Sequence, residues 1–484
     1  MTTRYRRHWP FGCILATGLA LRACAWIAYR PALVYIDTAR YLGDDKHGLD
    51  PLGYSYLLLR PVLLAGGGLA GVAAVQHLLG LAMAACLYAL VLRHGAGRWL
   101  AALVAAPVLL DAYQVQAEQM IMPDVLFEAL IVAAMAVLLW RPAPGLARLA
   151  CGAALLGVSA TVRQVGEVLI LPLLGYVLAA APGWRRLVLA NGKALRGTWP
   201  ATALAVFALP VAGYMALSAG LLGNGFRLSN MDDAYLYGRL AHAADCATLR
   251  VPGYARPLCP APATAAALGV DGLATNPASA VFHYPGAATR RFDEAILTQQ
   301  PLRVAGDVAS DAIKVFALTR NTDRGDTPVA RWQFQPRADD PLTAVLRAYQ
   351  LRGGFTPGPL LLALLFIGTA GVFASNRDRA PRLGCLLTTG LAVTVLLGAD
   401  LYEFSWRYQL PALVTLPLAG ALGATALIRL AVTRWSGGQG RMIRCTLTRR
   451  SARSRATSSI PTTGSGSART TSSAATDPAA PTRS

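Results

Sequence analysis

The sequence has 484 residues, of which 54% are hydrophobic and only 14% are charged; a soluble domain carries about 25% charged residues. Long stretches carry almost no charge and are separated by basic clusters. This pattern excludes an ordinary soluble protein and predicts an all-α polytopic membrane protein, because backbone in lipid must be satisfied inside helices. The net charge of +20 indicates no nucleic-acid partner, since the arginines lie in short loops and in the C-terminal tail.

Apolar runs that are long enough to cross a bilayer recur along the chain. The first follows a basic start and lacks a cleavage site before a polar segment, so we expect it to stay uncleaved. The fifth and sixth are short and nearly continuous, which is compatible with one tight hairpin. We predict about ten transmembrane helices, at residues 11–30, 70–92, 98–113, 122–140, 146–162, 165–182, 200–221, 356–374, 383–400 and 409–431.

The loops between these runs alternate in charge. Every loop on the side of the N-terminus is basic, and the loops on the other side hold many of the acidic residues. Because cytoplasmic loops collect Lys and Arg, we predict that both termini lie inside the cell and the acidic loops outside it. We therefore expect a multi-pass protein of the plasma membrane, in contact with the lipid bilayer, whose active site faces the extracytoplasmic side.

The apolar runs divide the chain into four parts. Residues 1–221 are predicted to form an N-terminal transmembrane bundle with a first outer loop at 31–70, and residues 356–432 the C-terminal transmembrane helices. Between spans seven and eight, residues 222–355 are expected to form a small extracytoplasmic domain, either α or mixed α/β. Residues 433–484 are rich in Ser, Thr, Arg and Pro, a composition that cannot bury a core and predicts a disordered basic tail.

Two cysteines, Cys246 and Cys259, lie in the predicted extracytoplasmic domain. Cysteines outside the cytoplasm commonly form disulfides, so we expect this pair to be joined; two free thiols are the alternative. No CxxC pair and no His/Cys cluster in the sequence has the spacing of a zinc site.

Ionisable residues beside membrane spans are costly and are often functional. Five are predicted to share one membrane–water boundary: Asp37 after the first span, Asp124 at the start of the fourth, Arg163 and Glu167 at the hairpin, and Arg407 at the start of the last. A carboxylate there can act as a general base or hold a metal ion. An arginine there can bind a phosphate through two hydrogen bonds.

Each of these residues also has a purely structural interpretation. Asp37 and Asp124 could cap helix N-termini. Arg163 and Arg407 could extend from span ends toward water, and Glu167 could pair with Arg163 one helical turn away. Both interpretations are compatible with the sequence.

Five segments carry a further pattern in their order along the chain. They are Asp37 in the first outer loop, Pro51-Leu52-Gly53-Tyr54-Ser55-Tyr56, Met122-Pro123-Asp124-Val125-Leu126-Phe127, Thr161-Val162-Arg163-Gln164-Val165-Gly166 and Arg407-Tyr408-Gln409-Leu410-Pro411. In this order they resemble motifs of the GT-C superfamily of polyprenyl-phosphate-sugar-dependent glycosyltransferases, near its protein mannosyltransferase and aminoarabinose transferase branches. The resemblance covers residues 10–185 and 400–430.

The resemblance implies an inverting transfer of a sugar from a polyprenyl-phosphate carrier to an extracytoplasmic acceptor, which is a glycan, a lipid or a protein. It implies that Asp37 is the base for the acceptor and that Arg163 and Arg407 bind the donor phosphate. Asp124 would orient the acceptor or a metal ion. The secondary candidates are Asp44, Asp45, Glu167, Tyr54 and Tyr408.

Two positions depart from the family pattern. Asp37 lacks the adjacent acidic partner that the family has, so Asp44 and Asp45, which begin seven residues later, are the alternative acidic pair. Gln164 stands where the family usually has proline. Metal dependence therefore stays open: no cofactor is certain, and a divalent metal is possible.

Two other functions are compatible with the sequence. A lipid or solute transporter needs polar groups near mid-membrane, where Arg22, Gln76 and His77 lie. A lipid-linked glycan polymerase or ligase would place Arg and His in the large outer loop, where Arg290, Arg291 and His283 are found.

Overall fold

The computed structural model describes residues 8–35, 37–43, 49–142, 144–180, 198–318, 341–374, 379–402 and 404–455. Every regular element in these ranges is a helix, and one isolated parallel bridge joins Leu33 and Met120. This confirms the predicted all-α class. The chain divides into two compact units, Met1–Leu430 and Ala431–Ser484, and the candidate site lies in the first.

Five of the described helical segments are long and apolar enough to cross a membrane. A sixth is obtained if α6 (Arg98–Leu110) and α7 (Ala112–Gln119), which meet at an angle of 50°, form one bent span. The five are α2 (Trp9–Ala28), α5 (Gly68–Arg93), Trp199–Leu221 of α12 (Thr198–Leu217) and η4 (Ser218–Leu222), Ala380–Asp400 of α19 (Arg379–Asp400), and Pro411–Thr433 of α20 (Pro411–Arg455).

The predicted count of about ten spans is not confirmed, because several apolar runs fold as shorter helices. A helix rises 1.5 Å per residue, so about 17 residues reach about 25 Å, which is less than the ~30 Å of the hydrocarbon core. The shorter helices are α8 (Asp124–Leu139), α9 (Leu146–Val162), η2 (Gln164–Leu169) with α10 (Ile170–Ala180), and α18 (Gly358–Phe373). The first loop contains α3 (Thr38–Leu42), η1 (Ser55–Leu59) and α4 (Arg60–Leu64).

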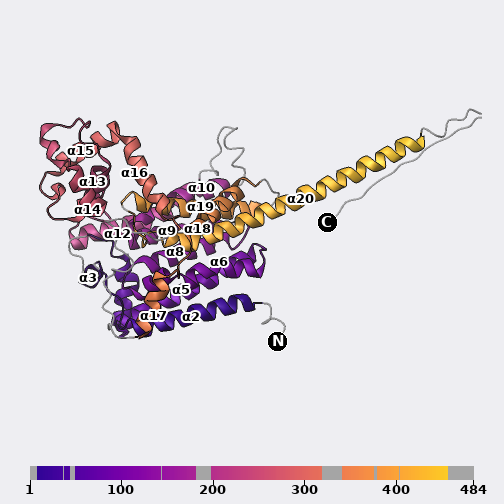
Figure 1. The fold of residues 1–484 in the computed structure, drawn as a ribbon, viewed down its shortest axis with the longest axis horizontal. Coiled ribbons are helices and arrows are strands. Elements are labelled where there is room, and N and C mark those ends of the chain that lie inside the picture. The colour runs from indigo at the N-terminus through magenta and orange to yellow at the C-terminus, as the bar shows by residue number, and fades with distance from the viewer. Residues whose placement is uncertain are drawn as a thin grey trace, which may run out of the picture. The chain divides into compact units, whose positions relative to one another are not determined.

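The apolar helices share one large core. α5 packs against α6 and α8, α9 packs against α8 and α12, and α19 packs against α10 and α18 (Figure 1). Glycine allows close approach at two of these contacts. A Cβ on Gly152 of α9 would meet the side chain of Leu138, and one on Gly157 would meet the backbone of Phe207. Small residues at helix contacts are typical of bundles in lipid.

A second, smaller core belongs to a helical insert between η4 and α18. Tyr237, Phe292 and Ile296 are almost fully buried in it. Figure 1 labels four of its helices, α13 to α16. We call these elements the insert domain: α13 (Asp232–Ala243), η5 (Gly253–Leu258), α14 (Pro262–Thr275), η6 (Ala280–Phe282), α15 (Gly286–Gln299) and α16 (Pro301–Lys314).

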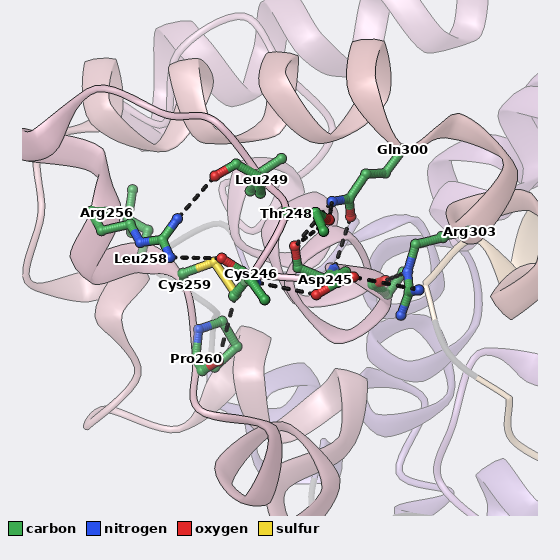
Figure 2. Close-up of a disulfide and its surroundings, with 12 residues drawn as sticks. Asp245, Cys246, Thr248, Leu249, Arg256, Leu258, Cys259, Pro260, Gln300 and Arg303 are labelled. Carbon is green, nitrogen blue, oxygen red and sulfur yellow. Dashed lines mark hydrogen bonds and ion pairs between the residues drawn. A yellow bond between two sulfur atoms is a disulfide. The ribbon is translucent and has the colours of Figure 1, made fainter.

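A disulfide joins Cys246 and Cys259, as the sequence predicts. It ties the loop after α13 to the end of η5 (Figure 2). Arg256 donates a hydrogen bond to the backbone carbonyl of Cys246 at 2.7 Å, and the Gln300 side chain bonds the backbone N–H and carbonyl of Asp245. Covalent and polar ties therefore fix a loop that has no regular structure of its own.

Two elements do not follow the predicted division of the chain. α17 (Pro341–Leu351) belongs to the stretch predicted as the extracytoplasmic domain, but it packs against α2 and α7. Its Tyr349 hydroxyl donates to the backbone carbonyl of Leu110 at 2.6 Å. α20 continues as a helix to Arg455, and residues 456–484 of the predicted tail lie outside the described part of the chain.

The insert domain contains a buried carboxyl group, Asp293 of α15. Its Oδ1 atom has no hydrogen-bond partner among the residues that the structure describes. Burial, assisted by the charge of Asp233, raises the pKa of Asp293 to about 7. Because the folded state holds this proton more tightly than the unfolded state, the stability of the insert domain should fall as pH rises from about 4 to about 7.

We expect Asp293→Asn to remove this pH dependence. The variant should stabilise α15 by at most roughly 4 kcal/mol near pH 8, where the wild-type carboxyl is ionised, and have little effect near pH 4, where it is protonated. Amide hydrogen exchange of α15, compared between the two proteins at each pH, measures this difference. Equal exchange protection of α15 in the two proteins near pH 8 would show that ionisation of Asp293 does not destabilise the folded state.

Candidate functional site

A cavity of about 480 Å³ lies where the helical bundle meets the insert domain. Five segments that are far apart in the sequence line it: the first loop around α3, the residues before α8, the turn between α9 and η2, the loop between α19 and α20, and the helices α13 and α14. Asp37, Arg163 and Arg407 are in its wall. Asp124 is buried directly behind them, within ion-pair distance of both arginines.

Asp37 comes immediately before α3 and is mostly buried. It holds the N-cap position of that helix, but its side chain makes no capping hydrogen bond. Its carboxylate pairs instead with Arg40 and with Arg407. Asp37 Oδ2 lies 3.0 Å from Arg407 Nη1. The Thr38 hydroxyl anchors the loop by donating to the backbone carbonyl of Ile121 at 3.1 Å. A capping role therefore does not account for the Asp37 side chain.

Asp124 and Arg163 form a second ion pair. Asp124 is the first residue of α8, and Arg163 is the single extended residue between α9 and η2. Arg163 thus pairs with Asp124, whereas Glu167 is exposed and is not part of the cavity wall. Asp124 Oδ1 also lies 3.9 Å from Arg407 Nε, which connects this pair to Asp37.

These contacts form one continuous series in which acids and arginines alternate. It begins where Arg40 Nε lies 2.9 Å from Asp50 Oδ2. One of its links, between Asp37 and Arg407, joins residues 370 positions apart. We call the series the charge chain; its members in order are Asp50, Arg40, Asp37, Arg407, Asp124 and Arg163.

The charge chain fixes the protonation of its central members. Burial acts to raise the pKa of Asp37, but Arg407 and Arg40 outweigh it and hold that pKa below its usual value. Burial acts to lower the pKa of Arg407, but Tyr408, Asp124 and Asp37 together raise it well above the usual range. Both groups are therefore charged at neutral pH, and each buried charge has a partner, as burial requires.

Aromatic rings orient the two cavity arginines. The Arg407 guanidinium lies 4.7 Å from the ring centre of Tyr35 and 4.9 Å from that of Tyr408. The Arg163 guanidinium lies 4.7 Å from the same Tyr408 ring. Such contacts fix the plane of a guanidinium group, and Arg407 Nη2 also donates a hydrogen bond to the Tyr408 hydroxyl at 3.0 Å. Tyr408, a secondary candidate from the sequence, therefore touches both predicted phosphate ligands.

Gly53 allows the predicted segment 51–56 to reach the site. A Cβ at this position would collide with the backbone of Thr161, so a larger residue would push the first loop away from the turn that carries Arg163. Tyr54 itself is fully buried outside the cavity wall, and its hydroxyl donates to Gln76 at 2.9 Å.

The described residues contain no group of three or more His, Cys, Asp or Glu side chains that could hold a metal ion. Asp44 and Asp45, the alternative acidic pair, lie outside the described residues.

No protein-family model matches the chain, and a search of curated proteins finds no significant match. The resemblance to GT-C glycosyltransferases thus stays a prediction from five short segments.

Among the wall residues with no role assigned from the sequence are Arg40, Asp50, Tyr235 and Asp271. Arg40 could have been found, because it follows Asp37 at the spacing at which helical neighbours pair. For Asp50, the sequence shows only that it lies in the same acidic loop. Tyr235 of α13 and Asp271 of α14 offered no signal, since they reach the cavity only through the folding of the insert domain.

A second polar cluster fixes the bend between α6 and α7, which leads into α8. The sequence singled out Arg22 and His77 but not their pairing with Glu118. Glu118, fully buried near the end of α7, accepts a hydrogen bond from Arg22 at 2.6 Å and lies 3.0 Å from His77 Nδ1. Arg22 also donates to two backbone carbonyls at the end of α6. Because α7 continues into the residues before α8, this cluster helps to position Asp124.

We expect Glu118→Gln to destabilise the bundle by about 3–5 kcal/mol, because it leaves the buried Arg22 without a counter-charge. Thermal unfolding in detergent, followed by tryptophan fluorescence, measures the loss. The paired change Arg22→Met with Glu118→Leu should recover most of it, since an apolar pair can replace a buried ion pair. A single variant that melts like the wild type would show that this cluster does not hold the bend.

Proposed function

We propose that this protein is a membrane glycosyltransferase of the GT-C type, which moves a sugar from a polyprenyl-phosphate carrier to an acceptor outside the cytoplasm. One observation carries the proposal. Asp37, Arg163 and Arg407, from three separate motif segments, meet in the wall of one cavity, and Asp124 from a fourth lies directly behind them. Segments that resemble motifs only by chance have no reason to converge.

The chemistry of the cavity suits a phosphate-linked donor. Breaking the bond between a sugar and its phosphate places negative charge on the leaving phosphate, and fixed positive groups stabilise that charge. Arg163 and Arg407 supply two planar guanidinium groups, each able to bind two phosphate oxygens. A volume of about 480 Å³ falls in the range of small-molecule sites.

In the free protein, Asp37 and Asp124 occupy the arginines that would bind the donor. This pairing keeps the guanidinium groups charged and oriented before a substrate arrives, which lowers the cost of organising the site. A phosphate that enters the cavity would compete with the carboxylates for the same N–H donors. The ion pairs are therefore a resting state of the phosphate site.

We place the protein in the plasma membrane, with the cavity on the extracytoplasmic side. The acidic first loop and the insert domain belong to the side that the positive-inside rule puts outside the cell. The Cys246–Cys259 disulfide agrees with an oxidising compartment.

The other two functions find less support in the contacts. Arg22, Glu118 and His77 bind one another and backbone carbonyls deep in the bundle, whereas a transport path needs polar groups that face a route for the solute. Arg291 of the insert domain is exposed and pairs with its neighbour Glu294, so it does not line the cavity as a polymerase or ligase would require.

We expect Arg407→Gln to weaken the binding of polyprenyl phosphate. A charge-assisted hydrogen bond contributes about 1.5–3 kcal/mol, so the dissociation constant should rise about 10- to 100-fold. Fluorescence-detected binding of polyprenyl phosphate to the full chain in nanodiscs measures this change.

Arg291→Gln is the matched control for Arg407→Gln, because it removes the same charge from an exposed position outside the cavity. It should leave the dissociation constant unchanged. Equal affinity in the Arg407→Gln variant and the wild type would remove Arg407 from the phosphate site.

We expect Asp37→Asn to abolish sugar transfer while leaving expression intact. Asparagine has no charge with which to hold Arg40 and Arg407, so both guanidinium groups lose their fixed orientation. The loss should exceed about 100-fold, the range found when one preorganised charge contact is removed. Cleavage of polyprenyl phosphates that carry radiolabelled mannose, glucose or galactose measures the rate, with the exposed Glu294→Gln as control. Full activity in the Asp37→Asn variant would exclude Asp37 from the mechanism.

A further inference from the structure

The insert domain contributes one wall of the cavity, and that wall contains a carboxylate. Tyr235 of α13 and Asp271 and Thr275 of α14 all line the cavity. Asp271 is exposed, and its carboxylate makes no hydrogen bond or ion pair with any described residue. It differs in this from Asp37, which two arginines hold.

Close packing of α13 on α14 sets the position of this wall. A Cβ on Gly238 would lie 2.6 Å from the backbone carbonyl of Val270 and 2.9 Å from the Cβ of Ala274, so the two helices touch here without intervening side chains. Gly238 comes one turn after Tyr235, and Val270 directly precedes Asp271. The contact therefore brings Tyr235 and Asp271 to the cavity together.

A break in α14 sets the direction of the second half of the helix. Gly269 has φ +66° and ψ −173°, a conformation that residues other than glycine rarely adopt. The chain changes direction there, and the helical turn that follows carries Asp271 and Thr275. The orientation of Asp271 thus depends on a specific backbone feature.

The charge chain makes Asp37 a poor proton acceptor. A general base works best when its pKa lies near the operating pH. Arg407 and Arg40 hold the pKa of Asp37 below its usual value against the effect of burial. When a donor phosphate binds Arg407, Asp37 still has its ion pair with Arg40. The base for the acceptor is therefore better sought elsewhere in the cavity.

We infer that Asp271 takes the proton of the acceptor hydroxyl during transfer, an inference that rests on the proposed function. The acceptor oxygen forms a bond to the anomeric carbon of the sugar. The bond from that carbon to the phosphate oxygen breaks, and its electron pair leaves with the polyprenyl phosphate. The acceptor proton moves to a carboxylate oxygen of Asp271, so atoms and charges balance without any further reactant.

The electrostatic surroundings of Asp271 agree with this role. The protein around the cavity partly desolvates its carboxylate, which raises its pKa, and the nearby charge of Asp37 adds to the effect, while Arg407 and Arg40 act against it. Tyr235, which also lines the cavity, feels the charge of Asp271 in turn. A raised pKa makes Asp271 a stronger base than an ordinary surface carboxylate.

The test compares Asp271→Asn and Asp271→Glu with the wild-type full chain in nanodiscs. Polyprenyl phosphates that carry radiolabelled mannose, glucose or galactose serve as donors, and water serves as the acceptor. Because a base acts only when ionised, the wild-type turnover number should fall as pH drops through the pKa of Asp271. Asp271→Asn should lower the turnover number about 10²- to 10⁴-fold, abolish this acid limb and leave the donor KM unchanged.

Asp271→Glu keeps a carboxylate and should restore part of the rate together with the acid limb, which a purely structural role would not predict. Glu294→Gln, the exposed control in the same domain, should match the wild type. An Asp271→Asn variant that keeps the wild-type rate, or that keeps the acid limb, overturns the inference and leaves the proposed function intact. A wild type that neither binds polyprenyl phosphate nor cleaves any of the donors overturns both.

Discussion

The alternating ion pairs of the charge chain are the contacts on which the rest of the site depends. Three carboxylates and three guanidinium groups come from the first loop, the start of α8, the α9–η2 turn and the α19–α20 loop. A buried charge that loses its partner costs several kcal/mol. Each of these segments is therefore held where its neighbours put it, and the cavity keeps its shape because none of them can move alone. The charges that organise the fold at this point are also those that suit a phosphate.

The polar cluster around Glu118 also positions the site through paired buried charges. Glu118 satisfies Arg22 and His77 in a region where unpaired polar groups are costly. This fixes the bend between α6 and α7 and so the entry into α8, where Asp124 stands. Gly53 contributes through its lack of a side chain, which lets its backbone lie against that of Thr161. Ion pairing and close backbone packing thus determine together how near the first loop comes to Arg163.

The sequence predicted the all-α class, the disulfide, and four residues that meet at one site. These inferences rest on apolar runs, compartment chemistry and charges beside spans, which are local signals. The number of spans was not predictable in the same way, because α9 and α18 are largely apolar and yet too short to count as spans. Asp271 carried no signal either: its place in the cavity follows from the contact at Gly238 and the break at Gly269, which only the folded insert domain shows.

Charge balance during transfer connects the charge chain with Asp271, which lies in the cavity wall formed by the insert domain. A phosphodiester donor brings one negative charge, and the leaving polyprenyl phosphate carries a second one when it is fully ionised. The charge chain is already neutral, with as many carboxylates as guanidinium groups. The new charge on the phosphate is therefore best accommodated if a carboxylate of the cavity becomes neutral in the same step. Asp271, the acid that no arginine holds, meets this requirement when it takes the acceptor proton, and the net charge of the site then stays constant throughout the reaction.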